Sequence, residues 1–108
     1  MENLKPEYRE KILAILRRNP KVEKAMLFGS RAMGTGRVES DVDLCLFGDA
    51  LTLSDQARLS HELEETTIPQ MIDLVLYRNI RSEPLREHLN RHGKVVFARN
   101  NEAVRTEW

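Results

Sequence analysis

The fold is decided by residues 22–47, which read VEKAMLFGSRAMGTGRVESDVDLCLF. An apolar run ends at Gly29-Ser30, ten residues follow, and a second apolar run begins with Asp41-Val42-Asp43. We expect strands over 22–28 and 41–47, because both runs are rich in strand-forming residues and are bounded by turn residues. Between them the pattern predicts a short helix at 30–33 and a loop that Gly34-Thr35-Gly36 opens.

Outward from this stretch the chain alternates helix and strand patterns. We expect helices over 6–18, 54–65 and 82–93, with Ser54 and Ser82 at two of their N-termini, and strands over 71–77 and 94–98. This order predicts an α/β fold, a small mixed or mostly parallel β-sheet flanked by helices. The length of 108 residues suits one domain over 1–100, followed by a flexible tail over 101–108.

Composition excludes several classes of protein. The chain has 17 Lys and Arg against 17 Asp and Glu, so its net charge is zero, which disfavours a nucleic-acid partner. Cys45 is the single cysteine, so an internal disulfide and a cysteine-rich zinc site are excluded. No apolar stretch reaches membrane-spanning length and the first ten residues lack a signal-peptide pattern. We therefore expect a cytoplasmic protein with no membrane partner.

Three aspartates are the candidate metal ligands and catalytic residues. Side chains alternate along a strand, so Asp41 and Asp43 share one face of the strand at 41–47. Asp73 lies inside the apolar run at 71–77, where an unpartnered charge is costly to bury. If the two strands are neighbours, the three carboxylates converge on one face. Such hard oxygen ligands suit Mg²⁺, which keeps open positions for substrate phosphates.

The turn at Gly29-Ser30 is the candidate phosphate site, with Arg31 beside it. A strand ends there and a helix begins, so backbone N–H groups and the Ser30 hydroxyl can hold phosphate oxygens. The lysine of a P-loop is missing from the sequence. A phosphate turn combined with metal-binding carboxylates predicts phosphoryl or nucleotidyl transfer assisted by two metal ions.

The order of these pieces resembles a known family. Gly-Ser, ten residues, Asp-x-Asp and a third aspartate on a later strand are similar to the signature of the DNA polymerase β-like nucleotidyltransferases, and the resemblance runs from about Val22 to Tyr77. It implies the palm fold of that family. The small size resembles the minimal nucleotidyltransferase (MNT) antitoxins, which are encoded beside HEPN-domain toxins. That likeness implies transfer of AMP from ATP to a tyrosine of a HEPN partner, within a hetero-oligomer.

The resemblance also implies a role for each residue. Asp41 and Asp43 would ligate two Mg²⁺ ions, and Asp73 would ligate the ion on the acceptor side and could take the acceptor's proton. Gly29 and Ser30 would hold the β and γ phosphates, and Arg31 would stabilise the developing charge. The sequence departs from many relatives at position 33, where a methionine replaces a second basic residue.

Two other functions remain open from the sequence. The chain could transfer a nucleotide to a small-molecule acceptor, although its length leaves no room for the second domain of such enzymes. It could also be a non-catalytic antitoxin that neutralises its partner by binding. His88 and His92 have the spacing of helical metal ligands, but without a metalloprotease pattern around them we predict a solvated helix face.

Overall fold

The computed structural model describes residues 4–99, so the tail expected over 101–108 lies outside the described residues. In chain order its helices and strands are α1 (Pro6–Arg18), β1 (Lys24–Phe28), α2 (Ser30–Met33), β2 (Val42–Phe47), α3 (Leu53–Glu64), β3 (Ile72–Leu76), the 3₁₀ turn η1 (Tyr77–Asn79), α4 (Glu83–His92) and β4 (Lys94–Ala98). The predicted elements are all present, and their ends differ from the prediction by no more than two residues.

The strands form one mixed sheet in the order β3-β2-β1-β4. The β2–β3 pair is parallel, whereas β1 pairs antiparallel with both β2 and β4. The mixed sheet is confirmed, but the alternative of a mostly parallel sheet is wrong. Helix α3 carries the chain across the sheet from β2 to its neighbour β3, and a parallel pair needs such a crossover, whereas α4 joins β3 to β4 at the opposite edge. The chain between β1 and β2 instead makes the short helix α2 and returns in the opposite direction.

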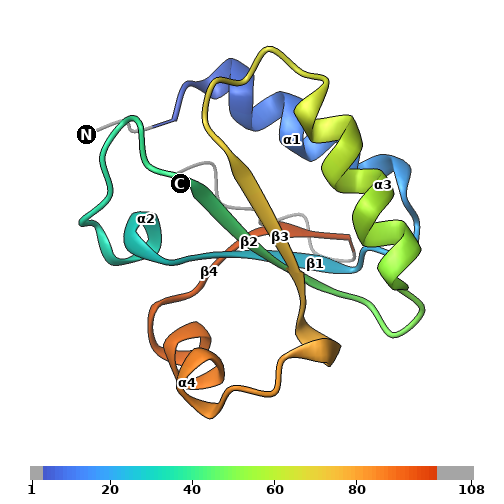
Figure 1. The fold of residues 1–108 in the computed structure, drawn as a ribbon, viewed down its shortest axis with the longest axis vertical. Helices are drawn as coiled ribbons and strands as arrows, with labels where there is room; N and C mark the ends of the chain where they lie inside the picture. The colour runs from blue at the N-terminus through green and yellow to red at the C-terminus, as the bar shows by residue number, and fades with distance from the viewer. Residues whose placement is uncertain (1–3, 100–108) are drawn as a thin grey trace.

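The two faces of the sheet have different covers (Figure 1). Helices α1 and α3 lie on one face, and α4 lies on the other. The larger core fills the α1/α3 face, where the buried side chains of β2 are Val42, Leu44 and Leu46. A smaller cluster lies under α4 and includes Cys45 and Leu89. Because side chains alternate in strands, the α4 face of β2 is also the face of Asp43.

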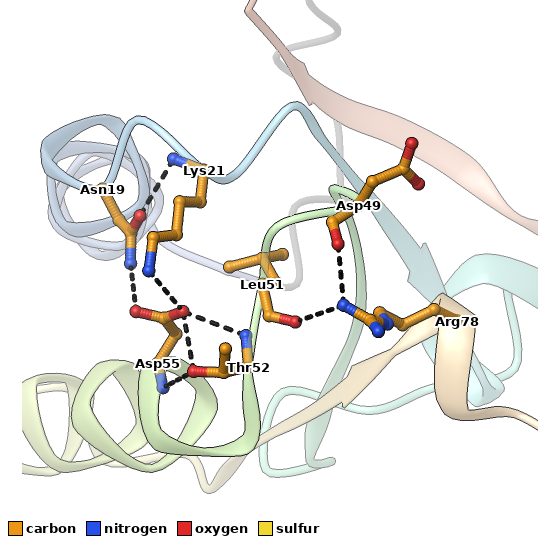
Figure 2. Close-up of polar contacts among 7 residues, drawn as sticks. All are labelled: Asn19, Lys21, Asp49, Leu51, Thr52, Asp55 and Arg78. Atoms are coloured by element: carbon orange, nitrogen blue, oxygen red, sulfur yellow. Dashed lines mark hydrogen bonds and ion pairs between the residues drawn. The ribbon is translucent and has the colours of Figure 1, made fainter.

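The N-terminus of α3 is held by a network of hydrogen bonds and an ion pair far from the candidate site (Figure 2). Thr52, and not the predicted Ser54, caps the helix, because its hydroxyl accepts the Asp55 N–H at 3.1 Å while the Asp55 carboxylate accepts the Thr52 N–H at 2.9 Å. Lys21 adds an ion pair to Asp55 at 3.2 Å. Hydrogen bonds from Thr52 and the Lys21 ammonium lower the pKa of Asp55 to about 2.

Next to this network Arg78 fastens the β2–α3 loop. Its guanidinium donates to the backbone carbonyls of Asp49 at 2.7 Å and Leu51 at 2.9 Å (Figure 2). Among residues 4–99, no helix is long and apolar enough to cross a membrane.

Candidate active site

The three predicted carboxylates gather where β2 and β3 begin. Asp43 and Asp73 are register partners in the parallel β2–β3 pair, so their side chains leave the sheet on the same face. Asp41 stands two residues before Asp43, at the entrance to β2. Asp41 and Asp73 are exposed, whereas Asp43 is half-buried. The two strands that carry the aspartates are therefore neighbours, as the convergence of the three carboxylates requires.

The surroundings of Asp43 disfavour its ionised form. Burial raises the pKa of Asp43, and the negative charges of Asp73 and then Asp41 raise it further. The positive charge of Arg31 acts in the opposite direction and lowers it. Three carboxylates thus share one electrostatic environment, and a cation among them would relieve their repulsion.

The turn at Gly29-Ser30 stands directly over Asp43. Strand β1 ends at Phe28, whose register partner on β2 is Asp43. Gly29 has φ 78° and ψ −158°, a backbone region essentially reserved for glycine. A Cβ atom at this position would also overlap the Asp43 carboxylate. Glycine therefore lets the turn lie against a candidate metal ligand, and it leaves the Ser30 side chain exposed at the first residue of α2.

Comparison with known proteins agrees with this geometry. The family model described as "Polymerase beta, Nucleotidyltransferase" matches residues 10–102. The chain belongs to the polymerase beta nucleotidyltransferase family. A protein of Methanocaldococcus jannaschii with the provisional name protein adenylyltransferase is 36% identical over 75 residues, which cover 68% of this chain and 78% of that protein. Family membership makes the chain a nucleotidyltransferase.

Several solved structures similar to this nucleotidyltransferase come from toxin–antitoxin systems. A chain from the crystal structure of a toxin–antitoxin with AMP-PNP is 30% identical, with a TM-score of 0.69 and coverage of 85% of this chain and 74% of that one. A chain from a tri-AMPylated Shewanella oneidensis HEPN toxin in complex with MNT antitoxin is 25% identical, with a TM-score of 0.65 and coverage of 86% and 71%. A third match, 28% identical with a TM-score of 0.68 and coverage of 85% and 74%, comes from an MntA toxin–antitoxin mutant in which two aspartates two positions apart are glutamates.

The sequence predicts Arg31 beside the phosphate turn, but in this nucleotidyltransferase its side chain contacts the loop that leads to Asp41. Its side chain points inward and only 2% of the residue is exposed. The guanidinium donates to the carbonyl oxygens of Val38 at 2.8 Å, Ser40 at 2.8 Å and Asp41 at 3.2 Å. These bonds fasten the loop that leads to Asp41. Contact of Arg31 with a nucleotide stays a prediction, while its observed contacts position a candidate metal ligand.

Gly36 shows how closely that loop wraps around Arg31. A Cβ atom at Gly36 would lie 2.9 Å from Arg31 Cγ and 3.1 Å from Arg31 Cα. Its N–H and that of Thr35 donate to the Ser30 carbonyl, each at 3.0 Å. The phosphate turn and the Asp41 loop are thus parts of one hydrogen-bonded unit.

His88 is a residue of the site that the sequence reading missed. The prediction of a solvated helix face is wrong for it, because His88 is half-buried and its Nε2 accepts the Gly29 N–H at 2.8 Å. The spacing of the apolar residues of α4 could have indicated that position 88 faces the sheet. Position 88 lies three residues after Leu85 and one before Leu89, on the side of α4 that packs on the sheet. His92 is exposed, as predicted.

The donor set suits a hard divalent cation. Asp41, Asp43 and Asp73 offer carboxylate oxygens. Burial raises the pKa of Asp43 first, and the charges of Asp73 and Asp41 add a repulsion that a cation would remove. Across residues 4–99, no three His, Cys, Asp or Glu side chains are close enough together to form a metal cage by themselves. A Mg²⁺ site completed by substrate phosphates fits such a set better than an all-protein cage.

Two hollows lie at opposite ends of the parallel strands. One of about 430 Å³ includes Asp73 and runs beside the open edge of β3, between α3 and the loop that carries Gln70 and Met71. The other, of about 410 Å³, is lined by Phe47, Tyr77 and neighbouring residues and contains none of the three carboxylates. The first borders Asp73 at the open edge of β3, and its α3 wall lies on the face of the sheet opposite to the one that the Asp73 side chain leaves.

Proposed function

We propose that the chain is an antitoxin that transfers AMP from ATP to the hydroxyl group of a tyrosine in a HEPN-domain toxin. One observation carries the proposal: Asp43 pairs with Asp73 in the β2–β3 register, directly under the Gly29-Ser30 turn. This places candidate metal ligands next to a candidate phosphate turn. The similarity to chains from structures described with AMP-PNP and with an AMPylated HEPN toxin supports ATP as donor and a protein as acceptor. A cytoplasmic location, where ATP is abundant, goes with this proposal.

Two Mg²⁺ ions would be held by Asp41, Asp43 and Asp73. When bound, they would neutralise the triphosphate and lower the pKa of the acceptor hydroxyl. Arg31 would contribute through the loop that it fastens, because this loop delivers Asp41. Ser30 would offer its exposed hydroxyl to the β and γ phosphates, and Gly29 allows the close approach of turn and carboxylate.

The reaction breaks one bond and forms one bond at the α phosphorus of ATP. The acceptor oxygen attacks this atom, and the bond to the β-phosphate oxygen breaks in line, so that pyrophosphate leaves. Asp73 is exposed beside the 430 Å³ hollow and can take the proton of the attacking hydroxyl. Product is a phosphodiester that joins AMP to the acceptor side chain.

The acceptor would approach along the open edge of β3. Strand β3 is an edge strand of the sheet, and Asp73 is among the residues that line the hollow beside it. Met71, two residues before Asp73, is 64% exposed, and Val38 is 55% exposed. These side chains would contact the protein that brings the hydroxyl.

The test is transfer of label to the HEPN protein encoded next to the gene. The chain, the HEPN protein and Mg²⁺ are incubated with ATP labelled on the α phosphate or, separately, on the γ phosphate. The proposal expects label on the HEPN protein from the α position alone, none with Asp43→Asn, and none after the HEPN acceptor tyrosine becomes phenylalanine.

Other outcomes would select another function. Complex formation without label would favour a non-catalytic antitoxin. Consumption of ATP with label on a small hydroxylated compound, but none on the HEPN protein, would favour a small-molecule acceptor. Label from the γ position would indicate a kinase and would overturn nucleotidyl transfer.

A further inference from the structure

His88 connects helix α4 to the turn that the proposed function uses for phosphates. Its Nε2 accepts the Gly29 N–H at 2.8 Å, across 59 positions of sequence. An acceptor nitrogen must be unprotonated, so this bond assigns the ring proton to Nδ1 of a neutral imidazole. The Phe28 ring packs edge-on against the imidazole, with centroids 6.2 Å apart and planes at 76°. The ring is therefore held from two sides.

The Gly29 peptide needs such an acceptor. Strand β1 ends at Phe28, so the β1–β2 and β1–β4 registers do not reach Gly29. Gly29 is half-buried, and an N–H that is shielded from water without a hydrogen-bond acceptor destabilises the fold. Gly29 is also held at φ 78° and ψ −158°, a conformation that the surroundings must impose. Among the described residues, His88 supplies the hydrogen bond to this peptide.

The position of Gly29 determines the distance between two functional groups. On one side a Cβ atom there would overlap the Asp43 carboxylate, and on the other Ser30 begins α2. A rotation of the Gly29 peptide would move the Ser30 hydroxyl relative to Asp43. The phosphate turn and the candidate metal ligand would then no longer fit one nucleotide.

We propose that His88 is a positioning residue for the nucleotide site, acting through the Gly29 N–H. The inference rests on the proposed function and deepens it. It requires that the imidazole is not simply a support for α4. That helix has other anchors, since Leu89 is buried and the Arg86 guanidinium donates to the Ile80 carbonyl at 2.7 Å. Removal of the ring should therefore leave α4 in place.

The test compares His88→Ala and His88→Gln with the wild type, and uses His61→Ala as a control. Glutamine keeps a hydrogen-bond acceptor at the end of its side chain, whereas alanine does not. His61 is an exposed histidine of α3, on the opposite face of the sheet. For each protein, calorimetry measures the affinity for AMP-PNP with Mg²⁺, kinetics measure kcat and KM for ATP, and ¹⁵N NMR follows the Gly29 amide.

We expect His88→Ala to weaken AMP-PNP binding and to raise the KM for ATP by about tenfold, with a smaller change in kcat. The Gly29 amide should shift and exchange faster in this variant, and His88→Gln should restore both the amide signal and most of the affinity. His61→Ala should match the wild type. Unchanged or tighter binding by His88→Ala would overturn the inference, as would equal losses in the alanine and glutamine variants.

Failure of the proposed function has a different signature. A wild type that binds AMP-PNP but transfers no AMP would refute the transfer reaction, while the affinities and the Gly29 amide would still decide the role of His88. A wild type that binds no nucleotide would refute both.

Discussion

Asp43 and Asp73 face one another across the parallel pair β2–β3, as partners in register on the same face of the sheet. Each belongs to a strand whose other face is buried against α1 and α3. Neither side chain can move to the other face of the sheet without a shift of the whole strand, because a one-residue slip would expose the apolar side chains of that strand. The sheet therefore holds like charges together, and this relationship underlies the predictions below.

Removal of the Asp43 charge should stop transfer and stabilise the metal-free fold. Burial and the charges of Asp73 and Asp41 raise the pKa of Asp43, so its ionised form at neutral pH costs stability. We expect Asp43→Asn to raise the Tm by about a few degrees without divalent ions. Because the pKa of Asp43 is higher in the folded state than in the unfolded state, the wild type loses its disadvantage once this carboxyl is protonated. The gain in Tm from Asp43→Asn should therefore shrink as the pH falls through the folded-state pKa toward the unfolded-state pKa.

Thermal unfolding of wild type and variant with EDTA, over a pH series, checks this prediction. Labelled-ATP assays at saturating Mg²⁺ check the loss of transfer. A lower Tm for Asp43→Asn in EDTA would contradict the electrostatic argument, and residual transfer close to the wild-type rate would contradict the assigned role.

Gly29 and Gly34 form a matched pair for testing the phosphate turn. Both have positive φ, 78° and 79°, but a Cβ atom meets the Asp43 carboxylate at Gly29 and no atom within 4 Å at Gly34. Alanine should cost about 1–2 kcal/mol of backbone strain in the left-handed region of Gly34 and about 1–3 kcal/mol in the glycine-specific region of Gly29. We expect Gly29→Ala to lose nearly all transfer, and Gly34→Ala to lose stability while it keeps most of its kcat. Equal activities in the two variants would argue against a tight fit between the turn and Asp43.

The Arg31 guanidinium should matter for the Asp41 loop even without any contact to nucleotide. Arg31→Ala leaves the carbonyls of Val38, Ser40 and Asp41 without this donor, at a cost of about 1–3 kcal/mol. Arg31→Lys should recover only part of the lost stability, because an ammonium group cannot reproduce the forked hydrogen bonds of the guanidinium. The exposed Arg37 of the same loop is the control, and Arg37→Ala should behave as the wild type.

Urea unfolding and the Mg²⁺ concentration for half-maximal rate give the two readouts. A shift in the Mg²⁺ requirement of Arg31→Lys, with a modest change in stability, is the expected sign of a displaced Asp41. An unchanged Mg²⁺ requirement together with a raised KM for ATP would instead favour direct nucleotide contact.

The Asp55 network should make part of the stability sensitive to acid. The Thr52 cap and Lys21 lower the folded pKa of Asp55 to about 2, below the ordinary value near 4. A lowered folded pKa gives stability that is fully present above the unfolded pKa and is lost as the pH falls from about 4 to about 2. We expect Asp55→Asn to lower the Tm at pH 7, and this difference to shrink over that window.

Asp49→Asn is the control, because Asp49 is an exposed carboxylate at the start of the same loop. Its Tm should follow that of the wild type over the whole pH range. Since the network lies away from the carboxylates of the site, Asp55→Asn should also keep its transfer activity at temperatures where it is folded.

Local pattern was sufficient to predict the helices and strands, whereas the roles of the site residues stay a prediction. The helix at Pro6–Arg18 and the strand at Lys94–Ala98 have the predicted bounds, since hydrophobic periodicity and the flanking Pro and Gly are written in consecutive residues. Caps were harder to predict. Ser54 and Thr52 are both good N-caps, and Thr52 caps α3 because Asp55 stands three residues later and also meets Lys21 from another part of the chain.

The sequence by itself determined that this protein has a Gly-Ser turn, an Asp-x-Asp strand and a third aspartate on an apolar strand, because each is a short run of residues with its own pattern. Only the tertiary structure decided that β2 and β3 lie side by side in register, that Arg31 turns inward to the Asp41 loop, and that His88 reaches Gly29. These relationships join segments far apart in the chain. They depend on which apolar faces pack together and on where each buried N–H and guanidinium finds an acceptor, and the packed fold alone settles both.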